Sequence, residues 1–278
     1  MNLTEACLAL EVSRSGYHDH LRKPWRKRHQ QDQALAGALS EEFALSRQTY
    51  GSPRLVIALR QRGLRHGKNR VRRLMREQGL QVRQKRRFVP RTTQADKASH
   101  PSPNLLGAYP APTRPNQAWV TDITYLPTGE GWLYVAAEMD LYSRRIIGWD
   151  AGPSLATELP ASALRRALDT RRGHDLHTVL HHSDRGCQYT SHAFRHQLAQ
   201  QRITQSMSRA GNCYDNATIE SFWATLKTEC FGGIIPETRA KARTMLFDYI
   251  ETFYNPVRLH SSLNFLSPIA FEKSTPLN

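Results

Sequence analysis

The chain has 278 residues, 39 % of them hydrophobic and 9 % aromatic, which excludes a disordered chain and leaves room for one large domain or two modest ones. Its formal net charge of +15 is concentrated at one end: residues 1–100 hold 22 lysines and arginines against 8 acidic residues, whereas residues 101–278 hold 17 against 16. The first third is therefore expected to bind a polyanion. Nucleic acid fits better than an acidic membrane, because no long basic helix with a bulky apolar face is evident.

Residues 1–90 are predicted to form a basic helical DNA-binding region. Apolar residues recur at helical spacing, between glycines and prolines, over 30–48, 52–63 and 67–80. A Gly-containing turn separates the last two segments, which predicts a helix-turn-helix. Around its apolar face, the last segment carries the candidate DNA-binding residues Arg70, Arg72, Arg73 and Arg76. The alternative is a solvated basic helix that packs on the second half of the chain.

A linker rich in Pro, Ser, Thr and Ala is predicted over 91–117, and an α/β core over 118–278. Three hairpin-like strands come first in the core, and helices and strands then alternate. The predicted strands are 118–127, 131–143, 144–152, 177–184 and 203–208. The predicted helices are 156–171, 191–202, 216–229 and 237–255. This order favours a mixed five-stranded sheet with helices on both faces and a C-terminal helical extension.

Three carboxylates are placed where a ligand site would need them. Asp122 lies inside the first predicted strand, where aspartate is disfavoured, and Asp184 ends an apolar strand before a Gly turn. Glu220 interrupts the apolar stripe of the helix 216–229. If the three converge, their repulsion would be relieved by hard divalent cations, and a pair of ions about 3.5–4 Å apart would suit displacement at phosphorus. Asp140 is a rival, either as a fourth acid or paired with Arg144 or Arg145.

Other polar residues on the same elements have two interpretations each. Asn216 and Lys227 share a helical face with Glu220, so that Lys227 is expected to reach a phosphate of bound DNA. Asn216 either caps the helix, which is the simpler role, or bonds near the site. Both histidines before Asp184, His181 and His182, are expected to be structural. Near the C-terminus, Asn255, Arg258 and His260 either touch DNA or, preferably, tie the chain end down by hydrogen bonds.

The chain closely resembles the DDE transposases of bacterial insertion sequences, and in particular the second-reading-frame product of the insertion-sequence-three family, which is related to retroviral integrases. The resemblance is carried by "WVTDITYLP", "DLYSRRIIGW", "HHSDRGCQYTS", "GNCYDNATIESFWATLKTE" and "YNPVRLHSSLNFLSP". Between Asp184 and Glu220 lie 35 residues, as in the D-D-35-E signature, and Lys227 follows seven positions after the glutamate. Segments around "SRSGYHDHLRKP" and "SRQTYGSPRLVIALRQRG" extend the similarity to nearly the whole chain.

The resemblance implies an RNase H-like catalytic core and metal-dependent strand cleavage and strand transfer at insertion-sequence ends. It assigns Asp122, Asp184 and Glu220 as the catalytic triad and as the ligands of Mg²⁺ or Mn²⁺, with two ions expected. Asp140 falls at a recurrent acid outside the triad. Element ends and target DNA are the implied partners, with a homo-oligomer on DNA. An upstream-frame product with a helix-turn-helix is a further expected partner or fusion.

Two other functions stay open at this stage: a structure-selective DNA nuclease of the same fold, and a DNA-binding regulator without catalysis. The expected location is the bacterial cytoplasm, at the nucleoid. No apolar run approaches the roughly 18 residues of a membrane span, and no signal peptide is recognisable. The four cysteines form no CxxC pair and suggest no disulfide framework, which fits a reducing compartment.

Overall fold

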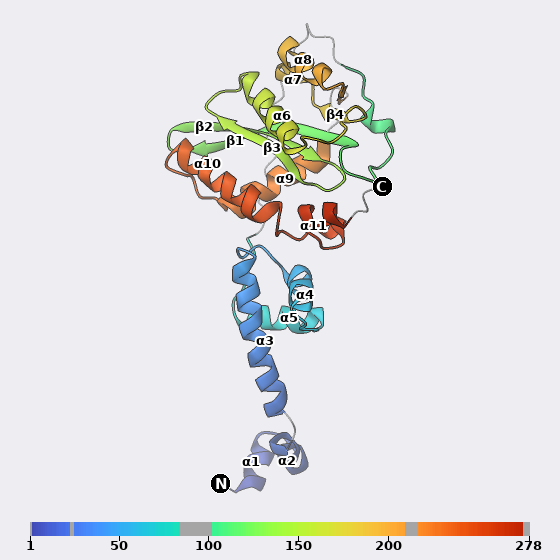
Figure 1. Cartoon of the computed structure of the whole chain (residues 1–278). Coiled ribbons are helices and arrows are strands. Elements are labelled where there is room, and N and C mark those ends of the chain that lie inside the picture. Colours follow the sequence, from blue (N-terminus) through green and yellow to red (C-terminus); the bar gives the residue numbers. More distant parts are fainter. Residues whose placement is uncertain (1, 23–24, 84–101, 209–215, 275–278) are drawn as a thin grey trace. The chain divides into compact units, whose positions relative to one another are not determined.

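The computed structural model describes residues 2–22, 25–83, 102–208 and 216–274. The chain divides into two compact units, Met1–Val82 and Arg83–Asn278, and Figure 1 colours both along the sequence. The first part of the predicted linker at 91–117, residues 91–101, lies outside the described residues. Its last part, from residue 102, runs beside the second unit's sheet, since the Met207 amide donates to the Pro103 carbonyl at 3.3 Å.

The first unit is built from helices in its described part. These helices are α1 (Leu3–Ala9), α2 (Arg14–Arg22), α3 (Trp25–Leu45), α4 (Ser52–Gln61) and α5 (Lys68–Glu77). A capping box starts α1, because the Asn2 side chain accepts from the Glu5 amide while the Glu5 carboxylate accepts from the Asn2 amide. The predicted segments 52–63 and 67–80 correspond to α4 and α5, so the predicted helix-turn-helix is present.

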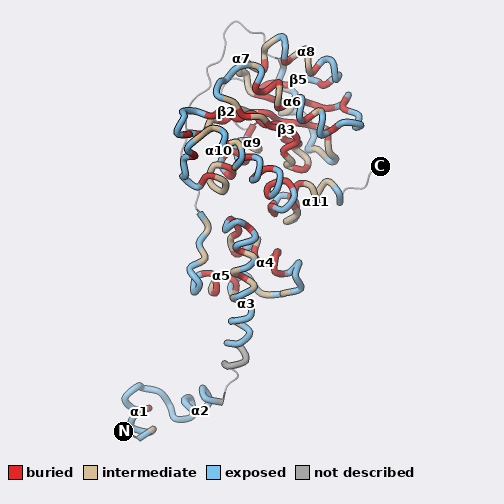
Figure 2. The backbone as a smooth tube through the Cα atoms, turned by 60° about the vertical axis from the view of Figure 1, so that its left-hand side comes forward, coloured by how far each residue is buried: buried red, intermediate tan, exposed pale blue. Residues whose placement is uncertain are grey.

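Helices α3, α4 and α5 share one apolar core. Each contributes residues at helical spacing, and the buried side chains are Leu35, Leu39, Phe43, Leu55, Leu59, Val71, Leu74 and Met75. Figure 2 shows these inner faces as buried and the outer faces as exposed. Because the apolar face of α5 is used in this core, its charged faces remain outside.

The second unit is built on a five-stranded sheet with the order β3-β2-β1-β4-β5. The strands are β1 (Ala118–Thr128), β2 (Gly131–Asp140), β3 (Ile146–Gly152), β4 (Leu180–Ser183) and β5 (Thr204–Met207). The first three form antiparallel pairs, whereas β4 runs parallel to β1 and β5 runs parallel to β4. This mixed sheet is the predicted RNase H-like architecture. The predicted strand 177–184 is shortened to β4, since the residues before Val179 turn into it.

Helices cover both faces of the sheet, as predicted. They are α6 (Glu158–Thr170), α7 (Cys187–Thr190), α8 (His192–Gln200), α9 (Ala217–Leu226), α10 (Arg239–Phe247) and α11 (Pro268–Lys273), with 3-10 turns at η1 (Leu106–Ala108) and η5 (Ser261–Leu263). On one face Gly148 lies against α6 so closely that a Cβ would be 2.3 Å from the Ala163 carbonyl oxygen. On the other face Trp149 donates to Glu251, which follows α10.

Two helices near the C-terminus change their winding before they end. Helix α9 continues as a π-helix, η3 (Lys227–Phe231), and α10 continues as η4 (Asp248–Tyr254). The predicted helices 216–229 and 237–255 therefore have about the right extent, but each finishes in π turns. No helix in the described ranges is both long and apolar enough to cross a lipid bilayer.

Candidate active site

Asp122 and Asp184 occupy neighbouring positions on β1 and β4. The parallel ladder pairs Val120 with His182. Two residues further on, where each strand presents the same face again, come Asp122 and Asp184. Asp184 lies just beyond the last residue of β4, where its Oδ1 accepts a 2.9 Å hydrogen bond from the Gly186 amide. Both aspartates are partly buried, so the sheet brings these two predicted carboxylates together.

Helix α9 lies along the edge of β1 that β4 leaves open, because the ladder between β1 and β4 stops at Val120. Asn216 Nδ2 donates to the Thr121 carbonyl at 3.4 Å, and Trp223 Nε1 donates to Asp122 Oδ2 at 3.0 Å. Glu220 stands between these two contacts on the same helical face, with its side chain exposed. The third predicted carboxylate is thus held on the element that contacts Asp122.

The pKa of Asp122 reflects the proximity of the other two carboxylates. Its pKa is raised to about 7, first by burial, then by the negative charge of Asp184 and, more weakly, by that of Glu220. Hydrogen bonds from the Ile123 amide and the Trp223 indole oppose the shift. Burial also raises the pKa of Asp184 and of Glu220, and the Gly186 amide partly offsets the first of these. Two further negative charges therefore act on Asp122.

This donor set suits a hard divalent cation. All three side chains supply only carboxylate oxygens, and a cation would stabilise the charged forms that burial and repulsion disfavour. Oδ2 of Asp122 accepts from Trp223 Nε1, and the Ile123 amide also bonds this carboxylate. Within the described residues no three ligating side chains are drawn together tightly enough to form a metal site, and Glu220 is the exposed member of the set.

Two polar neighbours on α9 and η3 also face this region. The Lys227 ammonium lies 5.2 Å from the centroid of the Tyr125 ring. Burial lowers the pKa of Lys227, and the charge of Asp122 partly offsets this. The preferred role of Asn216 as a helix cap is wrong: its side chain makes no capping hydrogen bond and turns to β1 instead. Asn216 Oδ1 is buried and has no hydrogen-bond partner within the described residues.

Trp223 and Tyr189 belong to this region and were missed in the sequence. The Tyr189 hydroxyl is 3.5 Å from Thr121 Oγ1. Its pKa is raised well above the ordinary value, first by burial and then by the charges of Asp122 and Asp184. Trp223 follows Glu220 by three positions, so its place on the same helical face was available from spacing. In an apolar stripe, however, a tryptophan indicates core packing first.

Asp140 is not part of the site. It is fully buried and pairs with Arg171 at 3.3 Å, so the predicted pairing with Arg144 or Arg145 is wrong. Its two carboxylate oxygens accept from the Asn116 and Tyr142 amides at 2.8 and 2.9 Å. Burial raises the pKa of Asp140, and Arg171 opposes the rise. Asp140 therefore fastens the end of β2.

The histidines before Asp184 have structural partners. His181 Nε2 lies 2.9 Å from Glu138 Oε2, and the two ring nitrogens of His182 each lie 2.9 Å from a hydroxyl, those of Ser206 and Ser208. This agrees with the structural role expected for both. Near the C-terminus, Asn255 exchanges two hydrogen bonds with the backbone of Ile146, at 3.0 and 2.9 Å.

Arg258 and His260 likewise tie the chain end to the core. Arg258 donates twice to Glu229 of η3, at 2.6 Å each. The His260 amide donates to the Leu266 carbonyl at 3.1 Å. The tying role preferred for this segment is thus observed. Of the cysteines, Cys7, Cys187 and Cys230 form no disulfide among the described residues, whereas Cys213 lies outside them.

In the first unit, the four arginines of α5 fall into two classes. Asp32 of α3 accepts from Arg70 and Arg73, at 2.6 Å each, so these two arginines join α5 to α3. The pKa of Asp32 is lowered, first by the hydrogen bond from Arg73. Arg72 and Arg76 are exposed, and none of the described ion pairs includes them.

Lys68 lies one turn before Arg72 and is also exposed. Lys68, Arg72 and Arg76 recur every four residues and form a stripe on the outside of α5. The sequence reasoning did not include Lys68. We refer to these three residues as the α5 cationic stripe.

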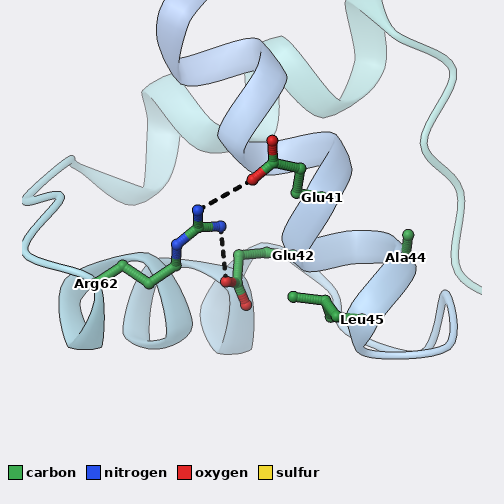
Figure 3. A pocket seen from close by; sticks show the side chains of 5 residues that line it. All are labelled: Glu41, Glu42, Ala44, Leu45 and Arg62. Atoms are coloured by element: carbon green, nitrogen blue, oxygen red, sulfur yellow. Dashed lines mark hydrogen bonds and ion pairs between the residues drawn. The ribbon is translucent and has the colours of Figure 1, made fainter.

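A pocket in the first unit does not suit DNA. It lies between the ends of α3 and α4 and is lined by Glu41, Glu42, Ala44, Leu45 and Arg62. Figure 3 shows Arg62 between the two glutamates, and it bonds each of them at 3.0 Å. Because the one cation among these lining residues is already paired with two carboxylates, the pocket offers no free positive charge to a phosphate.

Comparison with known proteins identifies three family models in the chain. Integrase core domain models match residues 112–213 and 201–268, and an HTH-like domain model matches residues 30–88. The 31 kDa protein of insertion element IS600 from Shigella sonnei is 41 % identical over 267 residues, covering 96 % of this chain and 97 % of that protein. The transposase InsF for insertion sequence IS3A of Escherichia coli K12 is 40 % identical over 268 residues, covering 96 % and 92 %.

Solved structures include viral integrases at low sequence identity. The catalytic core of HTLV-2 integrase, in complex with magnesium, is 13 % identical with a TM-score of 0.44, covering 58 % of this chain and 98 % of that one. An intasome of simian T-cell lymphotropic virus is 14 % identical with a TM-score of 0.49, covering 86 % and 76 %.

Proposed function

Because the chain belongs to the IS3 family of insertion-sequence transposases, we propose that it cuts DNA at the ends of its element and joins the freed ends to new DNA through Asp122, Asp184 and Glu220. The observation that carries this proposal is the grouping of the three carboxylates. Two come from neighbouring strand positions, the third comes from the helix along the same edge, and the charges of Asp184 and Glu220 both act on Asp122.

The three carboxylates would hold Mg²⁺ or Mn²⁺. When bound, a pair of such ions supplies positive charge for the attacking and leaving oxygens of a phosphodiester. The sheet fixes Asp122 and Asp184, and Glu220 extends from α9. A bound DNA strand would therefore lie between the edge of β1 and α9. Lys227 brings an ammonium group to the same edge, where it would contact a phosphate oxygen of the bound strand.

The nucleophile in this reaction is not a protein side chain. It is an oxygen of water or of DNA, which the protein only positions. Water serves for cleavage, and the freed 3′ hydroxyl serves for joining. No serine or tyrosine is required to form a bond to DNA. The state of Tyr189 supports this proposal, because its hydroxyl is buried beside Thr121 and its pKa is raised well above the ordinary value, which disfavours the nucleophilic phenolate.

The first unit would hold DNA through the α5 cationic stripe, Lys68, Arg72 and Arg76. These side chains are exposed on the second helix of the helix-turn-helix, whereas Arg70 and Arg73 are occupied by Asp32. Guanidinium and ammonium groups spaced along one helical face suit consecutive phosphates of a duplex. We propose that several copies of the chain act together on the two element ends.

The test uses oligonucleotide duplexes that carry the terminal sequences of the element, with Mg²⁺ or Mn²⁺. Cleaved and joined products from the wild-type chain support transposase activity, and their loss in Asp184→Asn with retained DNA binding supports the site. Cleavage without joining would favour a structure-selective nuclease. Unchanged cleavage by Asp184→Asn would reject the carboxylate site, and DNA binding by a wild type that neither cuts nor joins would favour a regulator.

A further inference from the structure

Four residues form one stripe along α9 and the start of η3: Asn216, Glu220, Trp223 and Lys227. Their spacing of four, three and four residues places them on a single helical face. Two of the four make hydrogen bonds to β1. Asn216 reaches the Thr121 carbonyl, and Trp223 reaches the carboxylate of the next residue, Asp122. Glu220 is thus bracketed by two contacts to adjacent residues of the strand.

The Trp223 contact is a rigid one. The side chain is 5 % exposed, and its ring packs against that of Phe222 with centroids 4.8 Å apart. An indole has one hydrogen-bond donor and no acceptor, so in this place its N–H can serve only the carboxylate. Oδ2 of Asp122 is thereby held, and the rotation of the carboxylate about χ2 is fixed. Each carboxylate oxygen has two lone pairs, so this contact leaves acceptor capacity for a cation.

Asn216 supplies the second contact. It is 6 % exposed, and its amide nitrogen is used on the Thr121 carbonyl, at the strand edge that β4 does not reach. The two contacts lie seven residues apart on the helix, about 10.5 Å by helical rise. Because the contacts are separated along the helix and reach adjacent residues of β1, together they restrict both the distance and the rotation of α9 relative to β1, which a single contact could not do.

We propose that Trp223, with Asn216, is a positioning residue that holds the Asp122 carboxylate and the Glu220 helix in register for a divalent cation. This inference rests on the proposed function and adds a role for two residues outside the carboxylate set. Hydrogen bonds to the carboxylates that ligate a metal usually matter about 10–100-fold in metal affinity, because they fix the orientation of the ligand.

The experiment measures Mn²⁺ binding to the full chain by electron paramagnetic resonance of the free ion, for wild type, Trp223→Phe and Trp149→Phe. Trp149 is the matched control. It is also 5 % exposed, and its indole also donates to a carboxylate, that of Glu251, at 2.8 Å. Both substitutions remove one indole N–H that donates to a carboxylate, and both keep an aromatic ring. Only Trp223→Phe is expected to weaken Mn²⁺ binding, by about tenfold or more.

Asn216→Ala is a second variant that leaves the indole in place, and it is expected to weaken Mn²⁺ binding in the same direction. It keeps the inference testable if Trp223→Phe does not fold, as judged by circular dichroism. Wild-type Mn²⁺ affinity in folded Trp223→Phe, or in Asn216→Ala when Trp223→Phe does not fold, would overturn the inference. So would equal weakening by Trp149→Phe.

The proposed function and the positioning role fail in different ways. If the wild-type chain binds Mn²⁺ no better than Asp184→Asn does, the carboxylate site is wrong and the positioning role is overturned with it. If the wild type binds Mn²⁺, loses it in Asp184→Asn and keeps its affinity in Trp223→Phe, only the positioning role is overturned.

Discussion

The Arg171 guanidinium donates to the carboxylate of Asp140 at 3.3 Å, and both side chains are almost completely buried. Arg171 also bonds Glu272 of α11, which in turn bonds Arg145 at 2.8 Å. The end of β2, the end of α6 and the C-terminal helix are joined by this network. A conspicuous aspartate in the sequence therefore serves the stability of the core.

This difference between Asp140 and Asp184 predicts opposite outcomes for the same substitution. Asp140→Asn should lower the free energy of unfolding by about 3 kcal/mol, because it leaves the buried Arg171 without its full countercharge. Cleavage per folded molecule should persist. Asp184→Asn should leave stability nearly unchanged and lower the cleavage rate by roughly a thousandfold or more, equivalent to about 4 kcal/mol. Urea denaturation and cleavage assays on both variants check this, and loss of cleavage in folded Asp140→Asn would contradict it.

The pKa of Asp122 predicts how pH affects the metal-free protein. The pKa is raised from 3.8 to about 7 in the folded state, so the folded state favours the protonated form. The contribution of Asp122 to the free energy of unfolding is therefore fully present below about pH 4 and is lost as the pH rises through 7. Asp122→Asn removes this loss. At pH 8 this substitution should raise the free energy of unfolding of the metal-free protein by about 1–3 kcal/mol, which is less than the full pKa shift would give because Asp122 is partly accessible to solvent. At pH 4 it should have no measurable effect.

Thermal denaturation at the two pH values, with and without Mg²⁺, measures this effect. Mg²⁺ should stabilise the wild type at pH 8 and leave Asp122→Asn unaffected, since the cation binds the charged carboxylates. An equal response of both proteins to Mg²⁺ would contradict the assignment of Asp122 as a ligand.

The two classes of arginine in α5 predict two different phenotypes. The triple variant Lys68→Ala, Arg72→Ala, Arg76→Ala should bind duplex DNA more weakly. It should also reduce the slope of log affinity against log salt by about 0.9 for each DNA phosphate that the variant no longer neutralises. The first unit should stay folded. Fluorescence anisotropy over a range of salt concentrations gives the slope.

Arg70→Ala, Arg73→Ala is the matched control, because it removes charge from the same helix on the side that contacts α3. Its expected effect is a melting midpoint lower by a few degrees, with a salt slope closer to that of the wild type. If this pair reduced the slope more than the triple variant did, the α5 cationic stripe would not be the DNA-contacting face.

Gly148 predicts a strong packing defect. A Cβ at this position would lie 2.3 Å from the Ala163 carbonyl oxygen and 2.4 Å from the Ala167 amide nitrogen, and both are backbone atoms that cannot rotate away. Gly148→Ala should lower the free energy of unfolding by about 1–3 kcal/mol or more, because α6 must move off the sheet. Gly173→Ala is no suitable comparison, since its φ is +88°. Gly37→Ala on α3 is suitable, because nothing lies within 4 Å of the added Cβ.

Much of the second unit could be predicted from the sequence because its signals are local. Strand runs, turn glycines and helical periodicity gave the order of elements, and an aspartate inside a strand marked Asp122. The period of two along β1 and β4 then brings Asp122 and Asp184 to the same face. The contacts between distant elements could not be predicted in the same way. Trp223 is an ordinary core residue in its helix until β1 is placed beside it.

The same limit applies to the partners of Asp140 and of the arginines in α5. Asp140 has two arginines nearby in the sequence, but its partner Arg171 comes from the end of α6. In α5 basic residues surround the apolar face, and only the rotation of α3, which brings Asp32 to Arg70 and Arg73, separates these paired arginines from the exposed ones. Helical periodicity carries no information about which neighbour covers which charged face.

The ion pair between Arg258 and Glu229 joins the helix that carries Glu220 to a segment that is synthesised after it. Glu229 follows Glu220 on the same continuous helix, and its carboxylate accepts from Tyr249 and Arg258, which are synthesised later. A nascent chain that has passed residue 229 contains Asp122, Asp184 and Glu220, but it lacks Arg258, whose guanidinium pairs with Glu229 on the helix that carries Glu220. A chain truncated before Arg258 would therefore leave Glu229 without this ion-pair partner, and the helix that carries Glu220 would lose one of its anchors to the C-terminal segment.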